Sequence, residues 1–500
     1  TDPEIVRLFG SPLQPPTDRR MQPPQEVMAE VLGLGERFGQ RRRILVVTAD
    51  ALTPRMAGPA IRAWQIASAL SEEHEVQLAT TSSRCEITSP SFTVVAASDE
   101  DLRLLEDWCD VIVLQGWILE GRPYLRDSRK VMVVDVYDPL HLEQLEQARD
   151  EADSVRRAAV RNATAVLNDQ LTRGDFFICA SAKQRDFWLG QMSALGRINP
   201  LTYDESETLD SLISVVPFGV PDDPPVATRR ALKGQVPGIA EDDEVILWGG
   251  GIYNWFDPLT LIDAVGRLRE RRPKVRLFFM GLKHPNPDVA EMRMAVSARE
   301  RADDLGLTDT HVFFNESWVP YEERHEYLLD ADIGVSTHLD HVETAFSFRT
   351  RILDYIWAAL PIVATTGDAF AELIEREGVG ITVPPEDAEA LEEALFRLLD
   401  DGEFAAMCRK NLESLRPSFA WSQVLRPLVE FCRSPRRAPD LVDHEMSREF
   451  QVAPDSPRRD WAEDLRLAGQ YLREGGPALL ARRAANRMKR RKSGGGPGLL

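Results

Sequence analysis

Three consecutive glycines, Gly249, Gly250 and Gly251, follow an apolar run that ends at Trp248 and precede a helical pattern that opens at Asp257. Glycines between a strand and a helix let the backbone approach an anion closely, with N–H groups available to bind it. The pattern therefore predicts a phosphate-binding loop. A tight turn without a ligand is the alternative.

A second segment, which begins at Ser347, has groups that suit a diphosphate and a ribose. We expect Ser347 to be the N-cap of a helix that runs to about Ala359. Arg349 and Arg351 stand beside that helix start, where free amides, the helix dipole and guanidinium charge favour a diphosphate. Asp354 lies about two turns, ~10 Å, further along the same face, so its carboxylate could accept hydrogen bonds from ribose hydroxyls. The alternative for Asp354 is a surface ion pair with Arg351.

The elements that must position these segments are apolar runs in two series. The first series comprises 43–48, 75–80, 111–114, 131–135 and 176–180, and the second comprises 244–248, 275–280, 311–314, 333–336 and 361–364. Continuous apolar strands that alternate with helical patterns are typical of parallel sheets covered on both faces. We therefore predict an α/β protein with two doubly wound Rossmann-like domains, joined by the Pro-rich stretch 216–225. Ligands of such domains bind where the carboxyl ends of the strands meet a crevice.

Length and composition agree with this organisation and exclude several classes. The 500 residues exceed one ordinary core, and 43% hydrophobic with 28% charged residues is a globular composition. The net charge of −20 disfavours nucleic acid as a partner. The five cysteines are scattered and form no CxxC pair, and there is no Asp-x-Asp metal motif. We expect a cytoplasmic protein, because no apolar run reaches the ~20 residues of a membrane span and the N-terminus lacks a signal pattern.

The order of these motifs resembles the family 4 retaining glycosyltransferases, whose fold is GT-B, over roughly residues 44–431. The segment 359–364 is similar to the end of that family's signature, in which two glutamates spaced eight apart precede Gly-x-Pro-Val-Val. Asp354 stands where the second, ribose-binding glutamate is expected. Phe346 occupies the position of the first glutamate, and Glu343, three residues earlier, is the candidate replacement.

The resemblance also assigns roles near the reacting centre. The family's Arg and Lys pair would fall on Gly251 and Phe256, so Arg349 and Arg351 are the remaining candidates to meet the phosphate charge. Asp138 follows a strand where the family carries a His-Asp pair, and we expect it to position the acceptor. The alternative is that Asp138 caps the next helix.

The remaining matches are the glycine-rich loop 54–62, the step 178–186, the linker 216–220, and a terminal helix within 416–433 that crosses back to the first domain. Trp318 could stack on a base, with a core or rim position as the alternative. The predicted catalytic residues are Asp138 and Arg351. The predicted substrate-binding residues are Gly58, Arg62, Gly249, Gly250, Gly251, Trp318, Glu343, Ser347, Phe348, Arg349 and Asp354.

The chain therefore divides into an N-terminal extension (1–40), an acceptor domain (41–220), a donor domain (221–415), a crossover helix (416–433) and a flexible tail (434–500). The tail includes a basic helical segment, 477–492, that suits an anionic membrane surface on the inner face of the cell membrane. The alternative for this segment is a solvated, disordered tail.

The leading hypothesis is a glycosyltransferase that moves a hexose or deoxyhexose from a nucleotide-diphosphate sugar to a glycan, glycolipid or other acceptor. The resemblance implies retention of configuration, a role in cell-surface polysaccharide synthesis, and no metal or cofactor besides the nucleotide-sugar co-substrate. A catalytically silent GT-B protein that binds a nucleotide sugar or a partner enzyme is the alternative. An NAD-dependent enzyme is disfavoured because the glycine triplet lacks the GxGxxG spacing.

Overall fold

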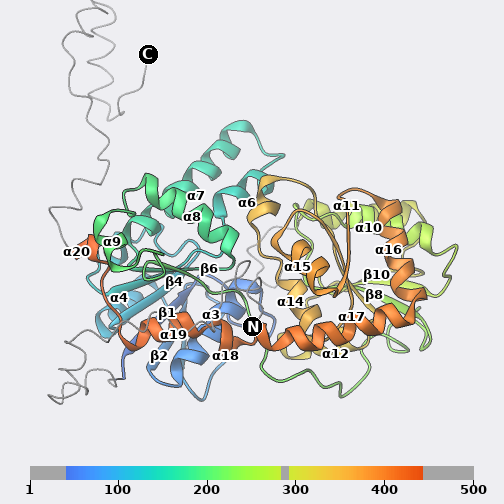
Figure 1. Cartoon of the computed structure of the whole chain (residues 1–500), viewed down its shortest axis with the longest axis horizontal. Coiled ribbons are helices and arrows are strands. Elements are labelled where there is room, and N and C mark those ends of the chain that lie inside the picture. The colour runs from blue at the N-terminus through green and yellow to red at the C-terminus, as the bar shows by residue number, and fades with distance from the viewer. Residues whose placement is uncertain (1–40, 283–291, 443–500) are drawn as a thin grey trace, which may run out of the picture. The chain divides into compact units, whose positions relative to one another are not determined.

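Two parallel β-sheets, each covered by helices, make up the part of the chain that the computed structural model describes, residues 41–282 and 292–442 (Figure 1). The first sheet has seven strands in the order β3-β2-β1-β4-β5-β6-β7, and the second has six in the order β10-β9-β8-β11-β12-β13. The strands of the first sheet are β1 (Arg43–Thr48), β2 (Glu75–Thr80), β3 (Thr93–Ala96), β4 (Val111–Gln115), β5 (Val131–Asp135), β6 (Phe176–Cys179) and β7 (Ile213–Val215). Those of the second are β8 (Glu244–Trp248), β9 (Val275–Phe279), β10 (Val312–Phe314), β11 (Ile333–Ser336), β12 (Ile362–Thr365) and β13 (Gly380–Val383).

Helices follow the strands in both halves. The helices that accompany the first sheet are α3 (Gly58–Ser71), α4 (Asp99–Trp108), α5 (Pro123–Arg126), α6 (Leu140–Gln147), α7 (Asp153–Arg173), α8 (Ala182–Ala194) and α9 (Pro200–Glu205). Those that accompany the second are α10 (Pro258–Leu268), α11 (Arg293–Asp304), α12 (Arg324–Leu329), α13 (Val342–Phe346), α14 (Thr350–Trp357), α15 (Ala369–Glu377), α16 (Ala388–Asp400) and α17 (Gly402–Leu415), with the 3-10 turn η2 (Tyr321–Glu323). The predicted α/β fold with two doubly wound domains is confirmed.

The sequence did not predict three strands, β3, β7 and β13. Each has three or four residues and lies at the edge of its sheet, where most of its side chains are only half-buried. An edge strand needs no continuous apolar run, because one neighbour and part of each face are open to solvent. The buried central strands do carry such runs, and the sequence revealed them together with one edge strand, β10, whose three residues are all apolar.

The point where the strand order reverses lies between β1 and β4 in the first sheet and between β8 and β11 in the second. Ligands of doubly wound sheets bind outside the carboxyl ends of the strands at this point. The glycine triplet follows β8 directly, and α13 and α14 follow β11. The fold therefore brings the two predicted diphosphate-binding segments to the same end of the second sheet.

The buried side chain of Tyr355 fixes α14 across these two strands. Its hydroxyl oxygen lies 3.1 Å from the carbonyl oxygen of Leu247 and 2.8 Å from that of Val335, at the ends of β8 and β11. The ring occupies the space that Gly334 leaves open, since a Cβ on Gly334 would lie 2.5 Å from the Tyr355 Cγ. Gly334 is therefore required by the tyrosine that packs on it.

The chain returns to the first sheet after α17, as the sequence predicted, but in three pieces rather than one helix. These pieces are η3 (Arg416–Phe419), α18 (Trp421–Val424) and α19 (Arg426–Arg433), and Figure 1 shows α17, α18 and α19 in one row. Pro417 and Pro427 lie in the first turns of η3 and α19, where the missing N–H is tolerated and the preceding helix ends. The ring of Phe431 stacks on Phe176 of β6 with centroids 4.3 Å apart, so the segment packs on the first domain.

The prediction of a flexible tail from residue 434 is wrong for its first nine residues. Arg437 Nε donates to Asp175 Oδ1 at 2.7 Å, and Arg197 Nε donates to Asp440 Oδ2 at 2.6 Å. The side chains of Arg197 and Asp440 are both nearly buried, so this ion pair ties α20 (Pro439–Val442) to the first domain. A segment rich in proline and charged residues is expected to be solvated, but here Arg437 and Asp440 pair with the buried side chains of Asp175 and Arg197.

Residues 1–40 and 443–500, including the basic segment 477–492, lie outside the described residues. The predictions for the N-terminal extension and for membrane attachment are therefore not tested by the fold. No helix within 41–282 and 292–442 combines the length and the apolarity that crossing a bilayer requires.

The contact between Gly334 and Tyr355 makes a stability prediction. We expect Gly334→Ala to lower the free energy of unfolding by about 1–3 kcal/mol, because the added methyl group would overlap the buried ring. The matched control is Gly190→Ala in α8, where nothing lies within 4 Å of an added Cβ and helix propensity predicts a gain of about 1 kcal/mol. Thermal denaturation of both variants measures the difference. Equal melting temperatures would contradict the packing described here.

Candidate active site

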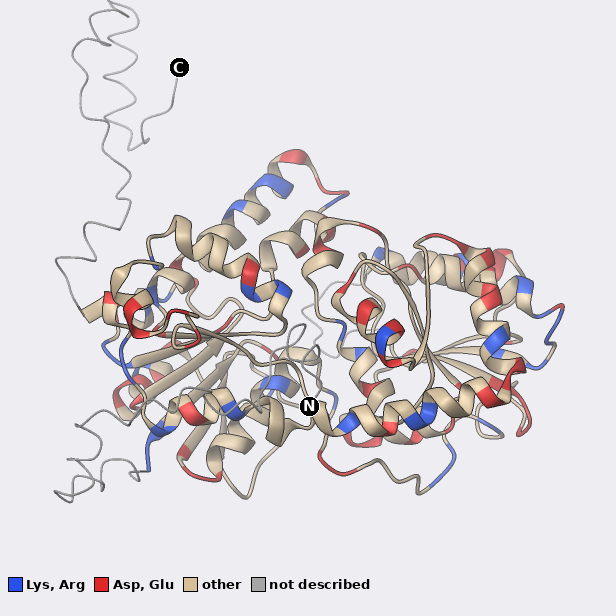
Figure 2. Cartoon of the chain, in the orientation of Figure 1, with Lys and Arg blue, Asp and Glu red and all other residues tan. Residues whose placement is uncertain are grey.

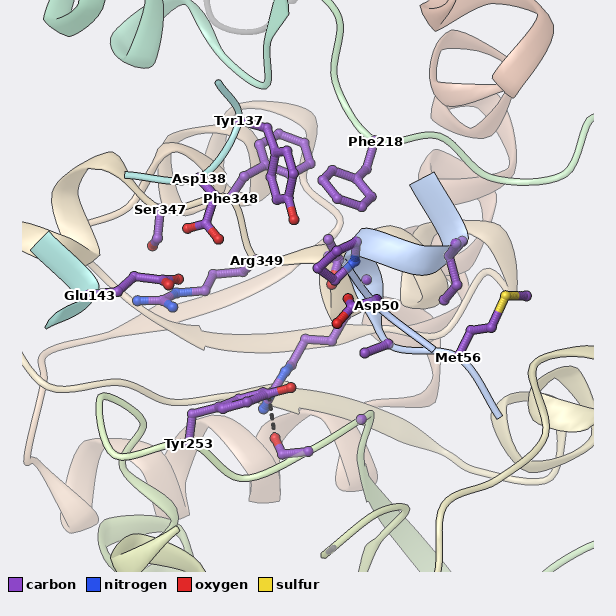
Figure 3. A pocket seen from close by; sticks show the side chains of 18 of the residues that line it. Asp50, Met56, Tyr137, Asp138, Glu143, Phe218, Tyr253, Ser347, Phe348 and Arg349 are labelled. Carbon is purple, nitrogen blue, oxygen red and sulfur yellow. Dashed lines mark hydrogen bonds between the residues drawn. The ribbon is translucent and has the colours of Figure 1, made fainter. Parts of the chain in front are cut away.

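A cavity of about 460 Å³ opens between the two sheets, and residues at the carboxyl ends of strands from both of them line it. Figure 3 shows side chains from both domains pointing into it. All but one of the predicted site residues line this cavity. They are Gly58, Asp138, Gly249, Gly250, Gly251, Trp318, Glu343, Ser347, Phe348, Arg349, Arg351 and Asp354.

Arg62 is the exception, and its predicted role in donor binding needs correction. Its side chain is fully buried and ion-paired with Asp135 at the end of β5, where Nη2 donates to Oδ1 at 3.0 Å. Its Nη1 and Nη2 also donate to the carbonyl oxygens of Pro217 and Val216 at 3.0 and 2.8 Å. Arg62 therefore holds the start of the linker against the first sheet and does not line the cavity.

The start of the predicted helix also needs correction. Ser347 is not its N-cap, because a separate short helix, α13, precedes it and ends there. Ser347 Oγ donates to the carbonyl oxygen of Thr344 at 3.1 Å, and the next helix, α14, begins only at Thr350. The N-cap is Arg349, two residues later than predicted, so Arg351 lies in the first turn of α14, beside the positive end of the helix dipole.

Arg351 is a buried cation without a carboxylate partner among the described residues. Its side chain is 7% exposed, and its guanidinium lies 4.0 Å from the ring centroid of Phe256 and 4.2 Å from that of Trp248. Its Nη2 donates to the carbonyl oxygen of Gly251 at 2.8 Å, whereas its Nη1 has no partner. Burial lowers the pKa of Arg351 to about 10, which still leaves it charged at neutral pH.

Arg351 places a positive charge where this sequence lacks the basic residues of the family that it resembles. The family's basic pair would fall on Gly251 and Phe256, and these are two of the groups that contact the Arg351 guanidinium. A buried charge is costly unless a counter-charge or hydrogen bonds compensate it. Arg351 Nη1, which has no partner among the described residues, is therefore a place in this cavity that favours an anion.

The glycine triplet contacts neighbouring side chains as well as lining the cavity. The Gly249 N–H donates to the Tyr355 hydroxyl at 2.8 Å, so this amide is not available to a ligand. Gly250 has a φ of 76°, which favours glycine. A Cβ on Gly251 would lie 2.9 Å from the Trp318 ring, which packs there and lines the cavity.

Glu343 and Arg349 form a buried ion pair. Arg349 Nη2 lies 2.9 Å from Glu343 Oε2, and Nη1 lies 3.2 Å from Oε1, so the pairing is bidentate. The Glu343 side chain is only 1% exposed. Glu343, the candidate replacement for the family's first glutamate, is thus already neutralised by Arg349. For the same reason, Arg349 offers less positive charge to a diphosphate than Arg351 does.

Phe346, at the position of the first glutamate, takes part in a contact between the domains. Its ring lies 4.5 Å from that of Phe187, and its carbonyl oxygen accepts a hydrogen bond of 2.8 Å from Gln184 Nε2. Gln184 Nε2 also donates to the carbonyl oxygen of Tyr137 at 2.7 Å. This one amide therefore links the loop after β5 to the segment before α14.

Asp354 is paired, but not with the partner that the sequence suggested. Arg324 Nε donates to Asp354 Oδ1 at 3.0 Å, and the alternative pairing with Arg351 is wrong. The Arg324 guanidinium lies 3.7 Å from the Tyr321 ring centroid and 4.4 Å from that of Trp357. Sequence reasoning missed Arg324 because thirty residues separate the two partners. Asp354 remains partly exposed and lines the cavity.

On the side of the first domain, Asp138 and Glu143 share a hydrogen bond. The alternative that Asp138 caps the following helix is wrong, because the N-cap of α6 is Pro139 and no side chain caps it. Burial raises the pKa of Asp138 to about 6, and burial together with Asp138 raises that of Glu143 well above its usual range. Burial also raises the pKa of Asp50, which follows β1, to about 6. Glu143, one turn after Asp138, could have been noticed from its place on the helix.

The comparisons with known proteins agree with this geometry. Residues 243–401 match the model of the family described as glycosyl transferases group 1. Probable sucrose-phosphate synthase 2 of Oryza sativa subsp. japonica is 26% identical over 168 residues, which is 33% of this chain and 17% of that protein. The chain thus aligns with about a sixth of the length of the curated relatives that it matches.

Several solved structures share the fold over 79% of this chain. Sucrose-phosphate synthase from Thermosynechococcus elongatus has a TM-score of 0.58 at 16% identity, with 98% of that chain covered. Anabaena HepE in complex with UDP-glucose has a TM-score of 0.56 at 14% identity, and all of that chain is covered. An E. coli trehalose-6-phosphate structure bound with UDP-2-fluoro glucose has a TM-score of 0.57 at 13% identity, again with full coverage.

The fold and the site together define the GT-B class that the sequence indicated. Both sheets, the cavity between them and the returning helices are those of two Rossmann-like domains with the GT-B arrangement. The match to the group 1 glycosyl transferase model lies within the second of these domains.

The raised pKa of Asp138 predicts how stability depends on pH. A carboxyl group whose pKa is higher in the folded protein stabilises the fold below its ordinary pKa of 3.8, and that contribution is lost as pH rises through about 6. The negative charges of Glu343, Asp50 and Asp135 raise the pKa of Asp138 further, whereas its hydrogen bond with Glu143 lowers this pKa.

We therefore expect Asp138→Asn to gain stability over the natural protein between pH 4 and pH 7, by about 2 kcal/mol, which is about 2–3 °C in melting temperature for a protein of this size. The matched control is Asp186→Asn, which removes an exposed carboxylate from α8. Melting curves across this pH range measure the difference. A constant offset between Asp138→Asn and the natural protein at every pH would show that Asp138 is ordinary.

Proposed function

We propose that the protein is a glycosyltransferase that moves a sugar from a nucleotide-diphosphate donor, held by the second domain, to an acceptor held by the first. The observation that carries this proposal is Arg351, a buried cation with an unpartnered Nη1 inside a cavity between two Rossmann-like domains. An anion at this point satisfies both the free N–H groups and the uncompensated charge. A diphosphate is the anion that the neighbouring glycine loop and helix start also suit.

In this proposal the donor diphosphate lies between the loop at Gly250 and Gly251 and the first turn of α14. Arg351 contacts it directly, and Arg349 adds a weaker charge because Glu343 already neutralises it. Asp354, one turn further along α14, accepts hydrogen bonds from the ribose hydroxyls. The two subsites are thus arranged along one helix.

The proposed reaction proceeds with retention. The acceptor hydroxyl oxygen forms a bond to the anomeric carbon on the face from which the nucleoside diphosphate leaves. The bond between that carbon and the phosphate oxygen breaks, its electron pair stays with the diphosphate, and the hydroxyl proton passes to a donor phosphate oxygen. Arg351 and the helix dipole stabilise the developing negative charge, because both are already in place before the reaction. Asp138 positions the acceptor from the end of the first sheet.

For the donor we propose a nucleotide-diphosphate hexose or deoxyhexose, with UDP-glucose as the first to test, since the similar HepE structure contains it. A glycan or glycolipid acceptor, a role in cell-surface polysaccharide synthesis, and a cytoplasmic location on the inner face of the membrane are part of the same proposal. We also propose that the transfer needs no metal ion. A thermal-shift screen with UDP, GDP, dTDP and ADP identifies the base.

A second candidate is a GT-B protein that binds a nucleotide sugar without transferring it. The loss of the first glutamate to Phe346, whose carbonyl and ring serve a contact between the domains, favours this candidate. Slow release of nucleoside diphosphate from the donor in the absence of acceptor separates the two. An enzyme hydrolyses its donor at a measurable rate, whereas a silent binding protein leaves it intact.

Arg351→Met tests the diphosphate subsite. Losing a charge-assisted hydrogen bond to an anion should raise the Kd of both UDP and inorganic diphosphate by about 10- to 100-fold. The fold should tolerate the change, because methionine fills similar space between Trp248 and Phe256 without a buried charge. Arg426→Met on α19, outside the cavity, is the matched control. Unchanged Kd values for Arg351→Met, measured by calorimetry, would remove this assignment.

Asp354→Asn tests the ribose subsite, and unlike Arg351→Met it should weaken the binding of UDP only. We expect the Kd of UDP to rise about tenfold, since a carboxylate accepts hydroxyl hydrogen bonds better than a neutral amide. The Kd of inorganic diphosphate should stay the same, because that ligand has no ribose. If Asp354→Asn weakens both ligands equally, Asp354 acts through Arg324 or the fold rather than on the ribose.

A further inference from the structure

The cavity separates charges by domain. Figure 2 shows acidic and basic residues interspersed along the described outer helices, but the cavity does not follow this pattern. Among the described residues that line it, the Arg side chains are Arg324, Arg349 and Arg351, and all three belong to the second domain. The first domain contributes no Lys or Arg to the described lining.

The carboxyl groups of the two domains also differ in their partners. In the second domain, Glu343 pairs with Arg349 and Asp354 pairs with Arg324. In the first domain, Asp50, Asp138 and Glu143 line the cavity, and no Lys or Arg among the described residues forms an ion pair with them. In Figure 3, Asp50, Asp138 and Glu143 all point into the cavity. The first domain therefore contributes three carboxyl groups and no Lys or Arg to the described lining of the acceptor half.

Gln115, at the end of β4, adds an observation that is independent of these acids. It lines the same cavity and is only 4% exposed. Its Nε2 donates to the carbonyl oxygen of Pro59 at 2.7 Å and to Thr48 Oγ1 at 2.9 Å, and the carbonyl fixes which end of the amide is the nitrogen. Its Oε1 has no hydrogen-bond partner among the described residues. This oxygen thus needs a hydrogen-bond donor that the described residues do not supply.

We propose that the acceptor half binds a sugar that presents hydroxyl groups and carries no phosphate or carboxylate group. The inference rests on the glycosyltransferase function proposed above. Hydroxyl groups supply the donors that Gln115 Oε1 and the carboxyl groups of Asp50 and Asp138 can accept. A phosphate would bring a second negative charge beside these carboxyl groups, with no first-domain cation to meet it. The acceptor specificity is therefore set by repulsion as well as by hydrogen bonds.

The test compares neutral sugars with their own phosphates on the full chain saturated with UDP. UDP, or the nucleotide that the screen selects, occupies the cation side of the cavity, so a sugar phosphate can use only the acceptor half. Saturation-transfer NMR measures the Kd of glucose against glucose 6-phosphate and of fructose against fructose 6-phosphate. We expect the neutral member of at least one pair to bind at least tenfold more tightly than its phosphate.

Variants show whether the carboxyl groups cause the discrimination. Asp50→Asn combined with Asp138→Asn should reduce the difference within the pair by about tenfold, mainly through tighter binding of the phosphate. Asp186→Asn, which removes an exposed carboxylate from α8, should leave it unchanged.

Equal or tighter binding of the phosphates by the natural protein would overturn the proposal. So would a lack of saturable binding by all four sugars while UDP binds normally. A failure of UDP itself to bind would instead overturn the proposed function.

Discussion

The site depends on one guanidinium group, that of Arg351, which is buried without a carboxylate partner among the described residues. Removing such a cation from water costs free energy, and the contacts with two aromatic rings and one carbonyl oxygen compensate for only part of this desolvation. A bound anion would compensate for the rest of the desolvation free energy. The same need explains why Gly251 and Phe256 stand where related proteins are expected to carry basic residues, since the cation now reaches this place from α14.

The residues around this cation are constrained by each other more than by a ligand. Tyr355 requires Gly334 to lack a side chain, and it takes the N–H of Gly249 for its own hydroxyl. Trp318 likewise requires Gly251 to lack a side chain. Glycines that looked like a phosphate-binding signature are therefore partly packing requirements, and the amide of Gly249 is already used by Tyr355. In the first domain, the carboxyl groups of Asp50 and Asp138 have no Lys or Arg partner among the described residues, and Gln115 Oε1 has no hydrogen-bond partner there, so a ligand can donate to them.

The sequence predicted the buried strands and the order of the domains because each central parallel strand must be apolar on both faces. It failed where a position depends on a partner far along the chain. Arg62 looked like a ligand of the donor, but it is buried and its four hydrogen bonds go to Asp135 and the linker carbonyls. Arg324 was missed because its partner Asp354 lies thirty residues away. Ser347 was misassigned because nothing local signals that a second short helix ends there.

The most direct test of the central claim is an experimental structure of the protein with a bound nucleoside diphosphate. The account predicts that Arg351 Nη1 lies within hydrogen-bond distance of a diphosphate oxygen, with the diphosphate between Gly250, Gly251 and the first turn of α14. A diphosphate bound elsewhere, with Arg351 Nη1 still unpartnered or paired with a carboxylate, would contradict the account.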